Sequence, residues 1–63
     1  MKAEFVGWMI MVGGEKDPKA YFRTHNEYKG RVIGYQFIEC SEELADTLEF
    51  GETYDITETG ELA

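Results

Sequence analysis

The chain has 63 residues and a mass of 7.2 kDa; 43% of the residues are hydrophobic, 14% are aromatic and 30% are charged. A chain of this length has room for one small hydrophobic core, so we expect a single domain over residues 1–63 whose last few residues fray. The aromatic content excludes a disordered chain, and the small size argues against a large enclosed active site. We therefore expect a binding protein and not an enzyme.

Charge is divided unequally between the two halves of the sequence. Residues 1–31 contain six basic and four acidic residues, whereas residues 32–63 contain nine acidic residues and no basic one. The halves carry net charges of +2 and −9, which together give the −7 of the whole chain. Such an asymmetry favours a charged interaction surface. The simpler interpretation is a solvated acidic face that keeps a small protein soluble.

Cys40 and His25 are the single cysteine and the single histidine. One cysteine cannot form an internal disulfide, which favours a reducing, cytoplasmic location. Two soft or borderline ligands are too few for a zinc site and no Asp-rich calcium loop is present, so we expect no metal and no cofactor. The apolar run Phe5–Val12 is much shorter than the roughly 20 residues that span a bilayer, so we expect no membrane association.

The first predicted element is a strand over Phe5–Val12, because β-branched and aromatic residues dominate it. Both of its alternating sets are apolar, namely Val6, Trp8, Ile10 and Val12 on one face and Phe5, Met9 and Met11 on the other. We therefore expect both faces to be covered, either in the centre of a sheet or in a homodimer through Phe5–Val12. Gly13–Pro18 follows as a turn.

Two further strands are expected in the middle of the chain. Lys19–His25 alternates, with Tyr21, Arg23 and His25 on its polar face. Asn26–Gly30 is predicted to be a loop, and Arg31–Cys40 is predicted to be the third strand, with a bulge or close approach at Gly34. Arg31, Ile33, Tyr35 and Phe37 share one face of that strand, so the two polar and aromatic rows are expected to lie side by side.

After Cys40 the spacing of the apolar residues changes from that of a strand to that of a helix. Ser41 is a good N-cap, two glutamates follow it, and Leu44, Ala45 and Leu48 form an apolar stripe that ends at Gly51. A two-turn helix is too short to be stable alone, so its leucines must pack on the sheet. Glu52–Thr57 is expected to be the fourth strand, Glu58–Gly60 a turn, and Glu61–Ala63 a short last strand or a frayed end.

This order of elements predicts a mainly β protein with one short helix. It fits a small five-stranded, partly open barrel of the OB-like or SH3-like kind, in which the helix follows the third strand. An open antiparallel sheet with one packed helix fits almost as well. No motif in the chain is specific to a known family.

Catalytic arrangements are not indicated. Cys40 would need a base such as His25, but the two lie on different predicted strands and no third residue orients them. The pair Gly13-Gly14 lacks the Lys-Ser/Thr that follows in a phosphate-binding loop. Paired carboxylates are plentiful, but they need a cleft that a chain of this size rarely forms.

The first functional hypothesis is a small acidic protein that docks on a macromolecular partner, expected to be a protein, and inhibits or redirects it. A phage-type inhibitor of a host enzyme, presenting carboxylates where that enzyme expects the phosphates of DNA, is one form of it. The helix and the following strand can hold these carboxylates in a fixed array, and we predict that the partner contacts Glu42, Glu43, Asp46, Glu49, Glu52 and Asp55.

The alternative hypothesis is an OB-like protein that binds single-stranded nucleic acid. Stacking aromatics beside cations are what such a ligand requires, and the middle segment interleaves the two. The predicted contacts are Tyr21, Arg23, Arg31, Tyr35 and Phe37. The net charge of −7 opposes this hypothesis, because nucleic-acid binders are usually basic. A homodimer through the first strand, with a structural role only, is a third possibility.

Overall fold

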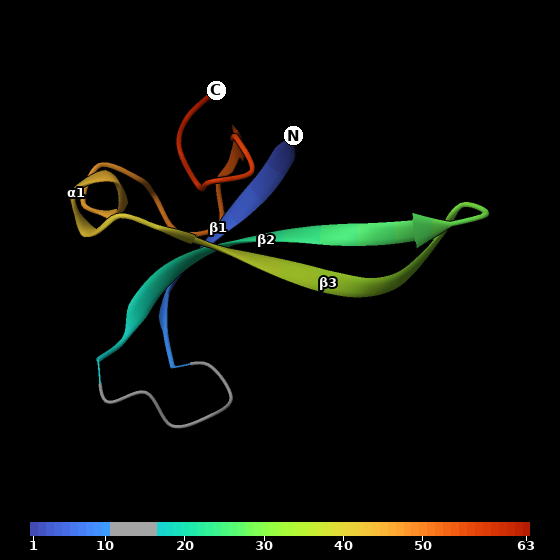
Figure 1. Ribbon diagram of the computed structural model, residues 1–63, viewed down its shortest axis with the longest axis horizontal. Helices are drawn as coiled ribbons and strands as arrows, with labels where there is room; N and C mark the ends of the chain where they lie inside the picture. The colour runs from blue at the N-terminus through green and yellow to red at the C-terminus, as the bar shows by residue number, and fades with distance from the viewer. Residues whose placement is uncertain (11–16) are drawn as a thin grey trace.

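The computed structural model describes residues 1–10 and 17–63. It contains an open antiparallel sheet with the strand order β3-β2-β1-β4 and one short helix. The elements are β1 (Lys2–Met9), β2 (Lys19–Tyr28), β3 (Arg31–Cys40), α1 (Glu42–Ala45) and β4 (Thr53–Asp55) (Figure 1). The mainly β prediction and its open-sheet alternative are therefore confirmed, whereas the described residues do not close into a five-stranded barrel.

β1 differs from its prediction in position and in burial. It begins at Lys2 and not at Phe5, while Met11, Val12 and most of the predicted turn lie outside the described residues. The expectation that both faces are covered is wrong, because Trp8 and Ile10 remain 47% and 60% exposed. A register shift against β2 between Phe5 and Gly7 also leaves Val6 without a directly opposite residue and interrupts the simple alternation.

β2 and β3 form a hairpin that is longer than the sequence predicts. β2 runs to Tyr28, so the expected loop Asn26–Gly30 shrinks to the two residues Lys29 and Gly30. Both have positive φ, 51° and 78°, which is the backbone twist that two-residue hairpin turns require. β3 spans Arg31–Cys40 as predicted. In Figure 1 the turn of this hairpin lies at the right, on the side opposite to α1, and extends away from the rest of the molecule.

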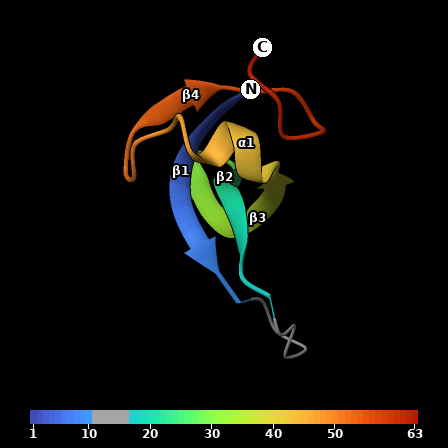
Figure 2. The ribbon, with the colours of Figure 1, turned by 90° about the vertical axis from the view of Figure 1, so that its left-hand side faces the viewer.

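α1 confirms the predicted cap but not the predicted length. The Ser41 hydroxyl accepts a hydrogen bond from the Leu44 N–H at 3.2 Å. The helix then ends at Ala45 after one turn, and the Thr47 hydroxyl donates to the Leu44 carbonyl at 2.8 Å. A side chain that binds the backbone in this way competes with continued helix formation. The strands curve around α1 in Figure 2.

The core lies between α1 and one face of the sheet. Phe22 has no exposed surface, and its ring packs edge to face against Phe5 at 5.7 Å and Tyr54 at 6.4 Å between centroids. The predicted apolar stripe of the helix reaches this core, since Ala45 is buried and Leu44 and Leu48 pack against it. The remaining buried members are Ala3, Ala20, Ile38, Cys40 and Ile56.

The end of the chain folds back onto β3. Ile56 and Leu62 form an isolated antiparallel bridge on either side of the predicted turn. This one pair of residues is all that the described structure shows of the expected last strand. Gly60 lies in this turn with φ of 82°, and a Cβ there would overlap the Glu39 carbonyl oxygen. Only glycine fits a backbone that is both left-handed and this close to a neighbouring strand.

Replacing Gly60 by alanine should therefore destabilise the protein more than the same change at Gly51. Gly51 also has a positive φ of 86°, but no atom lies within 4 Å of the position that its Cβ would occupy. We expect Gly51→Ala to cost about 1 kcal/mol through backbone strain alone, and Gly60→Ala about 3 kcal/mol because the turn must also move off β3. Urea unfolding of the two variants measures the difference, and equal losses would contradict the close packing of this turn.

Candidate functional site: the open face of the hairpin

The candidate site is the face of β2 and β3 that points away from the core. Directly opposite residues of an antiparallel pair lie on the same face. The register pairs Arg23 with Phe37 and His25 with Tyr35, whereas the core pair Phe22 and Ile38 lies on the other face. Arg23 and His25 are thus brought beside Phe37 and Tyr35 on one open surface.

The expectation that Arg31 belongs to the same row is wrong. A register shift after Asn26 leaves Ile33 without an opposite residue and sets Arg31 opposite Tyr28, which lies on the face of Phe22.

The aromatic residues of this face differ in accessibility. Tyr35 is 60% exposed, whereas Tyr21 is only 8% exposed. The Tyr21 ring packs edge to face against Phe37, with the centroids 6.4 Å apart and the planes at 82°. Tyr21 therefore supports Phe37, and the ring that offers the largest free surface on this face is that of Tyr35.

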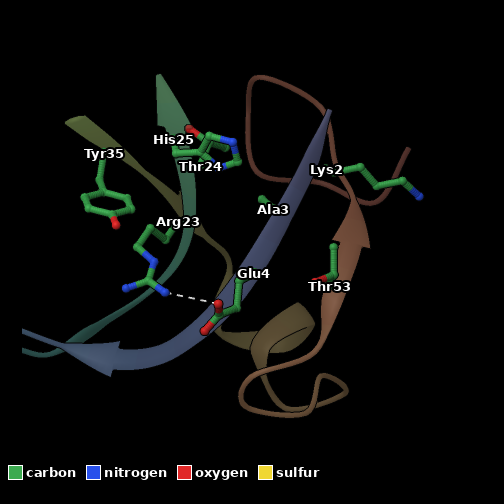
Figure 3. Close-up of a pocket in the computed structure, with 8 residues that line it drawn as sticks. All are labelled: Lys2, Ala3, Glu4, Arg23, Thr24, His25, Tyr35 and Thr53. Carbon is green, nitrogen blue, oxygen red and sulfur yellow. Dashed lines mark hydrogen bonds and ion pairs between the residues drawn. The ribbon is translucent and has the colours of Figure 1, made fainter. Parts of the chain in front are cut away.

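Arg23 joins β1, β2 and β3 on this face. Its guanidinium lies 5.1 Å from the centre of the Tyr35 ring and donates a hydrogen bond from Nη2 to Glu4 Oε1 at 3.1 Å (Figure 3). A cation over an aromatic face is attracted by the ring quadrupole, and the carboxylate fixes the other side of the guanidinium. The ring and the cation are therefore held together before any ligand arrives.

A shallow crevice opens beside Arg23, where β1 separates from β2. β1 pairs with β2 from Glu4 onwards, but its first residues pair with β4 instead. The crevice has a volume of about 250 Å³ and is lined by Lys2, Ala3, Glu4, Arg23, Thr24, His25, Tyr35 and Thr53 (Figure 3). The Lys2 side chain points away from the others in Figure 3 and reaches Asp55, whereas the Arg23 guanidinium lies over the Tyr35 ring.

The tip of the hairpin carries two further exposed cations, Lys29 and Arg31. Tyr28 and Arg31 are opposite each other at the turn, and the Lys29 ammonium lies 5.3 Å from the centre of the Tyr28 ring. Residues 23–37 carry three basic residues and one acidic residue, which gives this segment a net charge of +2 with His25 neutral. The hairpin is therefore positive on a protein whose net charge is −7.

The six predicted partner-binding carboxylates all belong to exposed residues, which extend from the start of α1 to the end of β4. Asp55 is not free, because Lys2 Nζ donates a hydrogen bond to Asp55 Oδ2 at 2.9 Å. This ammonium holds the pKa of Asp55 below its ordinary value. Within residues 1–10 and 17–63, the other five form no ion pair, namely Glu42, Glu43, Asp46, Glu49 and Glu52.

Cys40 and His25 lie on different faces of the sheet and do not form a catalytic pair. Cys40 is buried in the core, and this burial raises the pKa of its thiol. His25 is on the open face, where its Nε2 lies 2.8 Å from Glu27 Oε1. In the described part of the chain, no three potential metal ligands cluster together and no helix has the length and apolar character needed to cross a membrane.

No protein family, curated protein or solved structure matches this chain. The assignment of the site therefore rests on its geometry. Sequence reasoning did not identify Glu4 as the partner of Arg23, because that contact depends on the register of β1. It also did not identify Val32 and Ile33 as exposed residues, although they are 51% and 67% accessible.

The contact between Lys2 and Asp55 can be tested by titration. Lys2→Met should raise the pKa of Asp55 towards the ordinary value of 3.8, because the hydrogen bond and the positive charge are both lost. The native contact favours the ionised carboxyl. Its contribution to the free energy of unfolding is therefore present at pH values above the ordinary pKa and is lost as the pH falls through the lowered pKa. NMR titration of the Asp55 carboxyl measures the change. Lys29→Met is the matched control, and a shift there would contradict the assignment.

Proposed function

We propose that the protein binds single-stranded nucleic acid on the open face of the β2–β3 hairpin. The observation that carries this proposal is the register that sets Arg23 and His25 beside Phe37 and Tyr35 on one solvent-facing surface. Exposed rings stack on bases, and adjacent cations contact the backbone phosphates between them. The Tyr35 ring, with Arg23 held beside it, has both properties.

The connectivity of the chain also supports an OB-like architecture. β1 pairs with both β2 and β4, and α1 lies between β3 and β4 in the sequence. The Ile56–Leu62 bridge stands where a short fifth strand would begin, and Gly60 packs against the end of β3. OB-folds bind oligonucleotides on the face of their second and third strands, which is the surface proposed here.

The acidic net charge is compatible with this proposal because the charges are separated in space. The five carboxylates without an ion pair lie in α1 and in the segment between α1 and β4, whereas Lys29 and Arg31 lie at the turn between β2 and β3, at the far end of the hairpin (Figure 1). At physiological ionic strength, charges are screened over about 8 Å. A strand on the hairpin is therefore affected more by the nearby cations than by the acidic body.

Tyr35→Ala should weaken binding of single-stranded DNA or RNA by roughly 5- to 100-fold, because each stacked base contributes about 1 to 3 kcal/mol. Arg23→Ala should lower affinity and reduce the salt dependence by about 0.7 in the slope of log K against log salt, because Arg23 is the cation beside Tyr35. Fluorescence anisotropy of labelled single strands, with a duplex for comparison, measures both effects. Phe50→Ala is the matched control, since Phe50 is a 76% exposed aromatic residue on the body.

A variant with increased affinity gives a further test, because loss of stability cannot explain tighter binding. Glu4→Gln removes the carboxylate that pairs with Arg23, so it should increase affinity and steepen the salt dependence. A wild-type protein that binds no single strand at tens of micromolar, or equal losses for Tyr35→Ala and Phe50→Ala, would overturn the proposal.

We also propose a second candidate, in which the acidic surface docks on a protein partner and inhibits or redirects it. The specific observation is that five exposed carboxylates on one continuous segment form no ion pair in the described residues. Such a surface attracts a basic partner and speeds the encounter. Because such a surface presents negative charges, as a phosphate backbone does, the partner that we propose is a nucleic-acid-binding protein.

Reversing Glu43, Asp46 and Glu49 to lysine should abolish capture of such a partner from a cell extract, because attraction becomes repulsion. The matched control reverses Glu27, Glu58 and Glu61, which changes the net charge by the same amount but lies outside the array. The captured protein is identified from the wild type and then tested against both variants. Equal retention on the wild type and the first variant would exclude the acidic surface.

A further inference from the structure

The tip of the β2–β3 hairpin carries a different set of side chains on each of its faces. Tyr28 and Arg31 are directly opposite each other, on the face of the sheet that carries Phe22. The Lys29 ammonium lies 5.3 Å from the centre of the Tyr28 ring, so it belongs to the same group. We call Tyr28, Lys29 and Arg31 the tip cluster. This cluster lies on the reverse of the open face that carries Tyr35.

The tip cluster is exposed, and its positive charge is not neutralised. Tyr28 is 61% exposed, and both cations belong to exposed residues. Within residues 1–10 and 17–63, neither Lys29 nor Arg31 forms an ion pair. Figure 1 shows the turn on the side of the molecule opposite to α1, so the helix does not cover it. A ring beside two cations in solvent suits a ligand that combines phosphates with flat bases.

Two apolar side chains complete the tip. Val32 lies opposite Glu27 and so on the open face, and Ile33, which follows it, has no opposite residue. They are 51% and 67% exposed. Aliphatic side chains of several DNA-binding proteins insert against base pairs. The end of a duplex, where the last base pair has one face without a neighbour, offers such side chains a flat apolar contact.

We infer that the hairpin binds at a fork, where a nucleic-acid duplex divides into two single strands. This inference rests on the proposed function, because one strand of the fork lies on the open face against Tyr35. The other strand passes the tip cluster on the reverse face, where Lys29 and Arg31 contact its phosphates. Val32 and Ile33 then meet the last base pair of the duplex.

The placement of the two surfaces favours a fork over one continuous single strand. They lie on opposite faces of the sheet and meet at a turn of two residues, Lys29 and Gly30. A single strand that used both surfaces would have to reverse its direction around this turn. The two strands of a fork diverge at one point and need no such reversal. A duplex without single-stranded arms would leave the open face unused.

Fluorescence anisotropy with three labelled DNA probes tests the inference. The probes are a fork with two oligothymidine arms, a single strand with as many nucleotides as one strand of the fork, and a blunt duplex. The fork should bind about tenfold tighter than either of the others, because two linked contacts form at once. Its affinity should also depend more steeply on salt, by about 0.9 in the slope of log K against log salt for each tip cation.

Arg31→Gln should remove most of the preference for the fork and reduce the salt slope of the fork by about 0.9, because one phosphate contact is lost. The affinity for the single strand should stay close to that of the wild type. Lys19→Gln is the matched control, since it removes one positive charge at the opposite end of β2 and should leave the preference unchanged. Tyr35→Ala should weaken binding of the fork and of the single strand alike. Circular dichroism reports whether each variant is folded.

A fluorescent base analogue locates the contact of the apolar side chains. Placed in the last base pair of the fork, the analogue should change its fluorescence when the protein binds, because Val32 and Ile33 disturb its stacking. The same analogue in the middle of the duplex should not respond. Ile33→Ser should reduce the response at the last base pair.

The outcomes separate this inference from the proposed function. Equal affinity of the wild type for the fork and for the single strand would overturn the inference and leave the proposed function in place. A blunt duplex bound as tightly as the fork, or equal effects of Arg31→Gln and Lys19→Gln, would also overturn it. A protein that binds no single strand would overturn the proposed function, and the inference with it.

Discussion

The packing of Phe22 is the interaction on which the rest of the structure depends. This ring on β2 is completely buried and contacts Phe5 on β1 and Tyr54 on β4, so it connects three of the four strands. The helix that covers this side has only four residues. A chain of 63 residues therefore builds its core on one face of the sheet and leaves the other face of the hairpin in solvent.

The open face that results has an electrostatic character different from that of the body. The hairpin segment 23–37 has a net charge of +2, while the whole protein has −7. Glu4 moderates the charge of Arg23 and holds it beside Tyr35. The two proposed functions use different surfaces, the hairpin for a nucleic-acid strand and the segment after β3 for a protein, so one molecule can carry both.

Local signals in the sequence predicted several elements well. β3 has its predicted bounds and Ser41 caps α1, because strand propensity and capping act over a few residues. The predictions for β1 were less accurate, since the apolar run suggested a strand covered on both faces. Trp8 is half-exposed instead, and the strand has a register shift after Phe5 that no local signal reports. The hairpin turn was predicted as the longer loop Asn26–Gly30, because Lys29-Gly30 is not one of the usual turn pairs.

The sequence by itself determined the class of fold, the separation of charge between the halves, and the alternation that places Arg23 and Tyr35 on polar faces of their strands. These properties depend on residue type and on spacing within one element. The tertiary structure alone decided which residues meet: the contact of Arg23 with Glu4, the burial of Tyr21, the capture of Asp55 by Lys2 and the free edge of β3. Each of these depends on the register and order of strands far apart in the chain, which the packing of the whole core selects.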